Sequence, residues 1–229
     1  MTGLPGTPRC VLFDLDGTLV DTAPDLAYAA NQVRAEAGLP PLPPARYRPV
    51  ASAGARGLLK VGLDLAPEHP DYAARRESFL AHYRAHLARE SRLFDGMDAA
   101  LTAFERGGLA WGIVTNKPQW LTEPLLAQLG LAARAAVAIG QMEGVAPKPA
   151  PDALLLACRR AGVAPGDCVY VGDDRRDVVA ARAAGMPVIA AAWGYLGEGE
   201  DVADWQADAI CETPAELQAL CLPARAARA

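Results

Sequence analysis

The chain has 229 residues, a formal net charge of −5 at pH 7 and 52% hydrophobic residues. This length suits one large domain, or a core with a smaller insertion. The acidic balance argues against nucleic-acid binding, which needs a basic face, and no apolar run is long enough to span a bilayer. The N-terminal segment "MTGLPGTPRC" lacks the pattern of a secretory signal, so we expect a cytoplasmic protein. Five scattered cysteines without CxxC spacing are interpreted as reduced thiols.

Apolar runs of strand length occur along the chain at residues 10–15, 110–115, 135–139, 168–172 and 187–191. Helical patterns lie between most of these runs, at residues 97–106, 119–129, 151–161 and 175–184. Strands that alternate with helices at this spacing predict a Rossmann-like α/β core, in which a parallel sheet carries helices on both faces.

Residues 23–92 interrupt this alternation because they contain no convincing strand. They predict a helix at 24–37, a proline-rich break "GLPPLPPARYRP", a shorter helix near 56–62 and a long helix at 72–89. We interpret the block as an all-helical insertion after the first strand. The expected domains are a core of residues 1–20 and 93–229 and an inserted domain of residues 21–92.

Two carboxylates, Asp14 and Asp16, come straight after the first apolar run in "FDLDGT". An EF-hand calcium loop does not fit, because such a loop has glycine at position six and follows a helix. The pair could form a simple turn after the strand. A divalent cation, however, would offset the repulsion between the acids, and a metal-bound pair is the favoured interpretation.

The ends of the later strands and the loops after them carry further polar residues: Thr115, Asn116, Lys148, Asp173, Asp174 and Asp177. Ligands of open α/β sheets bind at the carboxyl ends of the strands. A threonine hydroxyl, free backbone amides and a lysine fixed between prolines suit a phosphate group. Clustered carboxylates suit magnesium, which prefers hard oxygen ligands.

The order "DLDGT", "VTN", "KP" and "GDDRRD" resembles the four motifs of the haloacid-dehalogenase-like phosphohydrolases, and the resemblance covers nearly the whole chain. The helical block then matches the α-helical cap of that family. "FDLDGTLVDTAPDL" resembles the phosphoglycolate phosphatase branch. "SAGARGLL", "LFDGM" and "WGIVTNKP" also resemble bacterial N-acetylmuramic acid 6-phosphate phosphatases.

The resemblance implies a role for each matched residue. Asp14 would be the nucleophile that forms an aspartyl-phosphate, and Asp16 would protonate the leaving oxygen and then activate water. Thr115 and the amide of Asn116 would bind phosphoryl oxygens, and Lys148 would neutralise charge. A metaphosphate-like transition state depends mainly on such positioning and on cations.

The same resemblance implies a Mg²⁺ site made by Asp14, by the backbone carbonyl of Asp16 and by Asp173. Asp177 would support this site and orient Lys148. Many members of the family have serine where Asp174 stands, so that residue is either a supporting acid or a metal ligand. The expected partner is a small phosphorylated metabolite, with neither nucleic acid nor membrane; the oligomeric state is unknown.

The substrate is less well defined than the chemistry. We expect 2-phosphoglycolate, with a sugar phosphate such as N-acetylmuramic acid 6-phosphate as the alternative. Asp16 argues against a dehalogenase or a phosphonatase, and intact Asp14 and Asp16 argue against a non-catalytic binding module; a sugar phosphomutase remains less favoured. In the insertion, Arg56 lies between glycines and is a candidate for specificity. His82 and His86 have i, i+4 spacing but no further ligands, and are interpreted as residues of a helix face.

Overall fold

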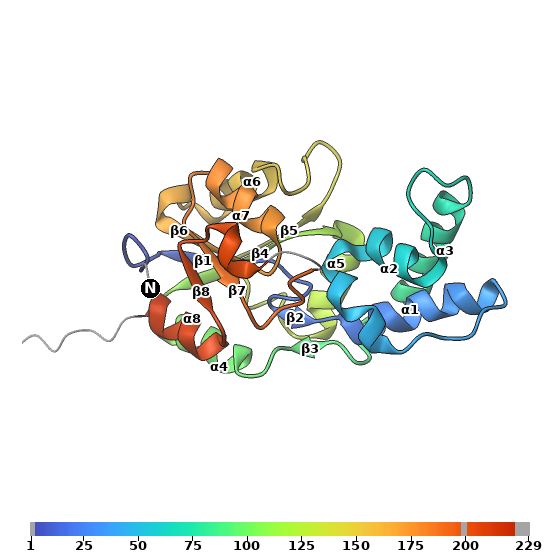
Figure 1. Cartoon of the computed structure of the whole chain (residues 1–229). Helices are drawn as coiled ribbons and strands as arrows, with labels where there is room; N and C mark the ends of the chain where they lie inside the picture. Colours follow the sequence, from blue (N-terminus) through green and yellow to red (C-terminus); the bar gives the residue numbers. More distant parts are fainter. Residues whose placement is uncertain (1–2, 198–200, 223–229) are drawn as a thin grey trace, which may run out of the picture.

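A computed structural model describes residues 3–197 and 201–222 of the chain. Its centre is a six-stranded sheet in which every pair of neighbouring strands is parallel (Figure 1). In spatial order the strands are β5 (Val137–Gln141), β4 (Ala110–Pro118), β1 (Cys10–Phe13), β6 (Cys168–Gly172), β7 (Val188–Ala191) and β8 (Ala209–Cys211). The predicted Rossmann-like sheet is confirmed. β8 is an addition at the edge that the apolar runs did not indicate.

Helices cover both faces of the sheet, and the central strand β1 shows why. Its four side chains are fully buried and alternate between two cores: Val11 and Phe13 belong to one, and Cys10 and Leu12 to the other. The first core includes α4 (Met97–Arg106), α5 (Gln119–Gln128) and α8 (Pro214–Cys221), and the second includes α6 (Asp152–Ala161) and α7 (Arg175–Ala183). Short 3₁₀ turns lie at η3 (Pro165–Asp167) and η4 (Val202–Trp205).

The helical block lies beside the carboxyl edge of the sheet (Figure 1) and packs α1 against both α2 and α3. It consists of α1 (Ala23–Glu36), the 3₁₀ turns η1 (Pro44–Arg46) and η2 (Arg48–Ala53), α2 (Gly54–Leu63) and α3 (Tyr72–Ala85). The predicted helix at 72–89 is thus too long. The chain turns at Ala88, which has a left-handed φ of 58° that a continuing helix could not adopt.

Two very short strands join the block to the sheet. β2 (Val20–Asp21) pairs antiparallel with β3 (Arg92–Leu93), so the two connecting segments run side by side.

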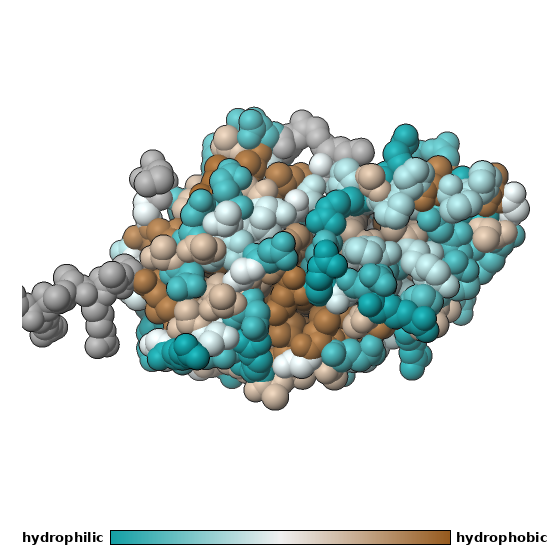
Figure 2. All heavy atoms as spheres, turned by 90° about the horizontal axis from the view of Figure 1, so that it is seen from below, coloured by the Kyte–Doolittle hydropathy of each residue, from teal (hydrophilic) through white to brown (hydrophobic). Residues whose placement is uncertain are grey.

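Figure 2 shows the underside of the molecule, where apolar surface gathers near the middle and hydrophilic residues cover most of the rest. The division into a core and an inserted domain at residues 21–92 stays a prediction.

All five cysteines are buried and unpaired. Among the described residues, no helix combines the length and the apolar character that crossing a membrane requires.

Candidate active site

Three carboxylates meet at the carboxyl edge of the sheet. Asp14 directly follows β1, Asp173 directly follows β6, and Asp177 lies in the first turn of α7. One oxygen from each lies within 4.8 Å of the others, and all three residues are buried. Such a cluster is costly unless cations offset its charge.

Lys148 supplies one positive charge to this cluster. Its Nζ lies 3.0 Å from Oδ1 of Asp14 and 2.7 Å from Oδ1 of Asp177. The ammonium also donates to the Tyr170 hydroxyl, which in turn donates to the carbonyl of Val114. Burial favours the neutral amine, but the two carboxylates outweigh it and raise the pKa of Lys148 above its usual value. The lysine is therefore a fixed cation.

One lysine does not balance three acids. Burial, together with repulsion from Asp14 and Asp177, raises the pKa of Asp173 to about 7. Burial also raises the pKa of Asp177 to about 6, even though Lys148 opposes this change. Hard carboxylate oxygens that carry excess negative charge are the donor set that Mg²⁺ prefers. The residues present fit a magnesium site.

Neighbouring segments hold Asp173 in place. Its oxygens accept hydrogen bonds from Thr18 Oγ1 at 2.8 Å, from Ser52 Oγ at 2.9 Å and from the backbone amide of Tyr195 at 3.0 Å. The loop after Asp14 passes so close that a Cβ on Gly17 would lie 2.2 Å from an Asp173 oxygen, and Gly17 has a φ of 91°. Only glycine satisfies both conditions, which explains its place in "DLDGT".

Ser52 is the point where the helical block reaches this cluster. Its hydroxyl lies 3.3 Å from the backbone carbonyl of Asp16, as well as donating to Asp173. Its own carbonyl accepts a hydrogen bond from the guanidinium of Arg176, on α7. The Asp16 carbonyl therefore lies beside the carboxylate cluster, as the family resemblance implies for a metal ligand.

The Asp16 side chain points elsewhere. Both of its oxygens accept hydrogen bonds from Lys117 Nζ, at 2.7 and 3.0 Å, and Oδ1 also accepts from Thr22 Oγ1 at 2.6 Å. Burial favours the neutral amine, but Asp16 outweighs it and raises the pKa of Lys117 above its usual value. Sequence reasoning missed Lys117. A lysine beside Pro118, at the end of the strand that carries Thr115, was the available signal.

Thr115 and Asn116 lie at the end of the same strand. The hydroxyl of Thr115 accepts a hydrogen bond from the amide of Lys117 at 3.2 Å. Thr115 also lines a cavity between the sheet and the helical block, which is described below. The side chain of Asn116 forms two hydrogen bonds with the backbone of Lys148, at 2.9 and 2.8 Å. This amide therefore positions Lys148. Phosphate binding by the backbone amide of Asn116 stays a prediction.

Asp174 caps a helix. Its Oδ1 accepts from the amide of Arg176 at 2.9 Å, while Oδ2 of Asp177 accepts from the amide of Asp174 at 3.1 Å. The two acids form a reciprocal capping box at the start of α7. Asp174 is not in the carboxylate cluster found among the described residues, so the geometry favours the supporting role over the ligand role.

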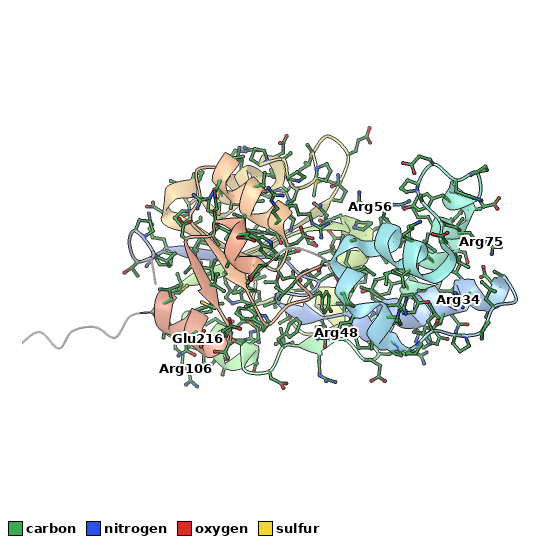
Figure 3. All side chains as sticks on the ribbon, in the orientation of Figure 1. Arg34, Arg48, Arg56, Arg75, Arg106 and Glu216 are labelled. Carbon is green, nitrogen blue, oxygen red and sulfur yellow. The ribbon has the colours of Figure 1, made fainter. Side chains whose placement is uncertain are left out.

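A cavity of about 650 Å³ opens above these groups. The sheet side contributes Asp14, Asp16, Thr115, Asn116, Lys117, Lys148, Asp174 and Arg176; the helical block contributes Ser52, Arg56, Arg76, Phe79 and Tyr83. Arg56 projects from the side of α2 that faces the sheet (Figure 3). His82 and His86 do not line the cavity: Nε2 of His82 lies 2.7 Å from Glu36, and His86 stacks on Tyr28 just beyond α3.

Comparison with known proteins agrees with this geometry. Residues 8–185 match the haloacid dehalogenase-like hydrolase family. The chain belongs to this family. Within this family the chain is a phosphatase, that is, a phosphoric monoester hydrolase. The two relatives described next are named for different substrates.

One relative is the phosphoglycolate phosphatase of Xanthomonas campestris pv. campestris strain 8004, with 49% identity over 92% of this chain and 95% of that protein. The N-acetylmuramic acid 6-phosphate phosphatase of Pseudomonas aeruginosa is 41% identical over 93% of this chain and 96% of that protein. A crystal structure described as a predicted phosphoglycolate phosphatase from Haemophilus somnus 129pt has 26% identity. It covers 95% of this chain and 100% of its own, with a TM-score of 0.83.

Proposed function

We propose that the protein is a Mg²⁺-dependent phosphomonoesterase that converts 2-phosphoglycolate to glycolate and phosphate through an aspartyl-phosphate. The observation that carries this proposal is the buried group of Asp14, Asp173, Asp177 and Lys148, of which Asp14 and Lys148 line the cavity. Three acids with one lysine suit a divalent cation and a phosphoryl group together. Mg²⁺, held by Asp14, the Asp16 carbonyl and Asp173, would supply positive charge to the phosphoryl oxygens.

The contacts of Asp14 favour one of its oxygens as the nucleophile. Lys148 Nζ and the backbone amide of Leu15 both meet Oδ1, at 3.0 and 2.7 Å. Among the described residues, Oδ2 has no hydrogen bond. In the first step this oxygen forms a bond to phosphorus, the phosphorus–ester oxygen bond breaks, and Asp16 gives its proton to the departing alkoxide.

The second step releases phosphate. Asp16, now ionised, takes a proton from a water molecule, whose oxygen forms a bond to phosphorus while the bond to Asp14 breaks. Lys148 and Thr115 offset charge and orient oxygens throughout, which is where phosphoryl transfer gains most of its rate. Asp14 and Asp16 are thus used in sequence on one phosphoryl group.

A second substrate has its own support. The cavity of about 650 Å³ is lined by Arg56 and Arg76 from the helical block as well as by Asp14. This space and charge would also hold a larger anionic sugar, and a relative at 41% identity is an N-acetylmuramic acid 6-phosphate phosphatase. A sugar phosphomutase is the less favoured candidate.

A phosphate-release screen against phosphorylated metabolites tests the proposal, with kcat/KM as the measure and Asp14→Asn as the inactive control. Preference for 2-phosphoglycolate supports the first substrate, and preference for the amino-sugar phosphate supports the second. A coupled isomerisation assay detects mutase activity. We propose the cytoplasm as the compartment, because five unpaired buried cysteines suit a reducing environment.

A further inference from the structure

Lys117 is an unusual group at the boundary between the sheet and the helical block. Only 8% of it is exposed, and its Nζ lies 4.6 Å from the ring centroid of Tyr83, on α3. Its hydrogen-bond partner is the carboxylate of Asp16, which it contacts through both oxygens. A buried ammonium needs an anion beside it, because an unpaired buried charge is strongly unfavourable.

The Tyr83 hydroxyl lies at the same place and lacks a well-formed hydrogen bond. The residue is 1% exposed, yet it lines the central cavity. Its hydroxyl has no partner at hydrogen-bond geometry among the described residues, although the nearby Lys117 ammonium opposes the rise that burial causes in the pKa of Tyr83. A buried hydroxyl without a partner is unfavourable, because it loses the hydrogen bonds that it would make with water. The cavity therefore contains a cation and a free donor side by side, both suited to one anionic ligand.

The position of Asp16 conflicts with its proposed role. To protonate a leaving oxygen above Asp14, the Asp16 carboxyl must face the ester. In the structure its oxygens are held by Lys117 and Thr22 instead. Turning Asp16 toward the ester would leave Lys117 buried without an anion, so another anion must replace it.

We propose that Lys117 Nζ and Tyr83 Oη form a subsite for a substrate carboxylate, and that filling this subsite releases the Asp16 side chain toward the ester oxygen. The inference rests on the proposed phosphatase function and names a substrate class within it. Lys117 adjoins the residue that must reach the ester, so the carboxylate belongs on the carbon that bears the phosphate ester, as in 2-phosphoglycolate. In N-acetylmuramic acid 6-phosphate the carboxylate is across the sugar ring from the phosphate and does not fit this subsite.

Two matched substrates test the subsite: 2-phosphoglycolate, and ethyl phosphate, which has a methyl group in place of the carboxylate. Tyr83→Phe removes a hydrogen bond to the charged carboxylate of the substrate. It should therefore lower kcat/KM for 2-phosphoglycolate by roughly tenfold or more. Ethyl phosphate should change by less than about twofold, because it makes no contact with that hydroxyl. Lys117→Met should lower the ratio of the two kcat/KM values by about 100-fold, and Lys117→Arg should restore part of it.

Controls separate the subsite from the fold and from the chemistry. Tyr28→Phe removes a hydroxyl elsewhere on the helical block, and Lys60→Met removes an exposed lysine; neither should change the ratio. Binding can be measured without turnover in Asp14→Asn. The protein is titrated separately with 3-phosphonopropionate, which carries a carboxylate, and with propylphosphonate, which has a methyl group in its place, and the two affinities are compared. The carboxylated compound should bind more tightly, and Tyr83→Phe in the same background should reduce the difference.

The outcomes distinguish the two proposals. If the wild type hydrolyses neither ester nor any other phosphate monoester, the proposed function fails. If it hydrolyses both esters and the ratio is the same in wild type, Tyr83→Phe and Lys117→Met, the phosphatase stands and the subsite is wrong. Equal binding of the two phosphonates in Asp14→Asn would also overturn the subsite, even if Lys117→Met does not fold.

Discussion

The charge of Asp173 should make the metal-free protein less stable at high pH. Asp173 is fully buried, and burial and two neighbouring carboxylates raise its pKa from 3.8 to about 7. The folded chain therefore binds a proton that the unfolded chain has released. The stability from this group is complete below the unfolded pKa and is lost as pH rises toward the folded pKa. Asp173→Asn removes the titrating group.

The magnitude follows from linkage. With pKa values of 3.8 unfolded and about 7 folded, the cost of ionising Asp173 grows by about 2–3 kcal/mol between about pH 5 and about pH 8. The difference in unfolding free energy, wild type minus Asp173→Asn, should fall by that amount over this range. Asp177 and Asp173 also repel each other, and the loss of this repulsion in Asp173→Asn favours the variant further at the higher pH.

Urea denaturation in EDTA at the two pH values measures this difference. Glu143→Gln changes an exposed acid and serves as the control, with a difference that should stay constant. Saturating Mg²⁺ should stabilise the wild type at the higher pH and have little effect on Asp173→Asn, since a bound cation offsets the buried charge. A wild-type-minus-variant difference that does not change with pH would refute the proposed effect of burial and repulsion.

Other predictions concern the reaction itself. Asp14→Asn should form no phosphoryl adduct, whereas Asp16→Asn should accumulate one with an aryl phosphate, visible by intact mass after acid quench; turnover by Asp14→Asn would point to direct attack by water. Asp16→Asn should also slow hydrolysis of alkyl phosphates by roughly 10²–10⁴-fold. Chelation should abolish activity and Mg²⁺ should restore it, so full activity in excess EDTA would contradict the metal site. Arg56→Ala should reduce kcat/KM for the anionic substrate by about tenfold or more while sparing a small aryl phosphate. Equal losses on both would assign Arg56 a structural role.

The sequence was most informative where a reactive side chain comes directly after a strand. Asp14 and Asp173 come straight after the apolar runs that became β1 and β6, and parallel strands place such residues at one edge. The short elements were harder to predict. β2 has two residues and β8 has three, too few to show alternation. α8 did carry a signal, since Thr213, Pro214 and Glu216 form a typical helix start.

Contacts between distant residues could not be predicted from the chain alone. Ser52 meets Asp173 across 121 positions, and Lys117 meets Asp16 across 101. The contact of Ser52 depends on how the helical block is placed over the sheet, which no strand end or periodic pattern indicates. Lys117 and Asp16 do lie at the ends of the paired strands β4 and β1, but the sequence does not show which side chains at that edge meet. Asn116 shows a different limit: the sequence indicated a polar group at the right edge, but only the structure shows its side chain bound to the backbone of Lys148.

The capping box at the start of α7 means that two nearby acids differ in how freely they can be replaced. Serine caps a helix about as well as aspartate, so Asp174 can be exchanged for serine with little loss of stability. Asp177 has no such substitute, because one of its oxygens completes the cap while the other meets Lys148. Position 174 is thus a place where evolution or protein engineering can remove a negative charge beside the catalytic cluster and leave the helix intact.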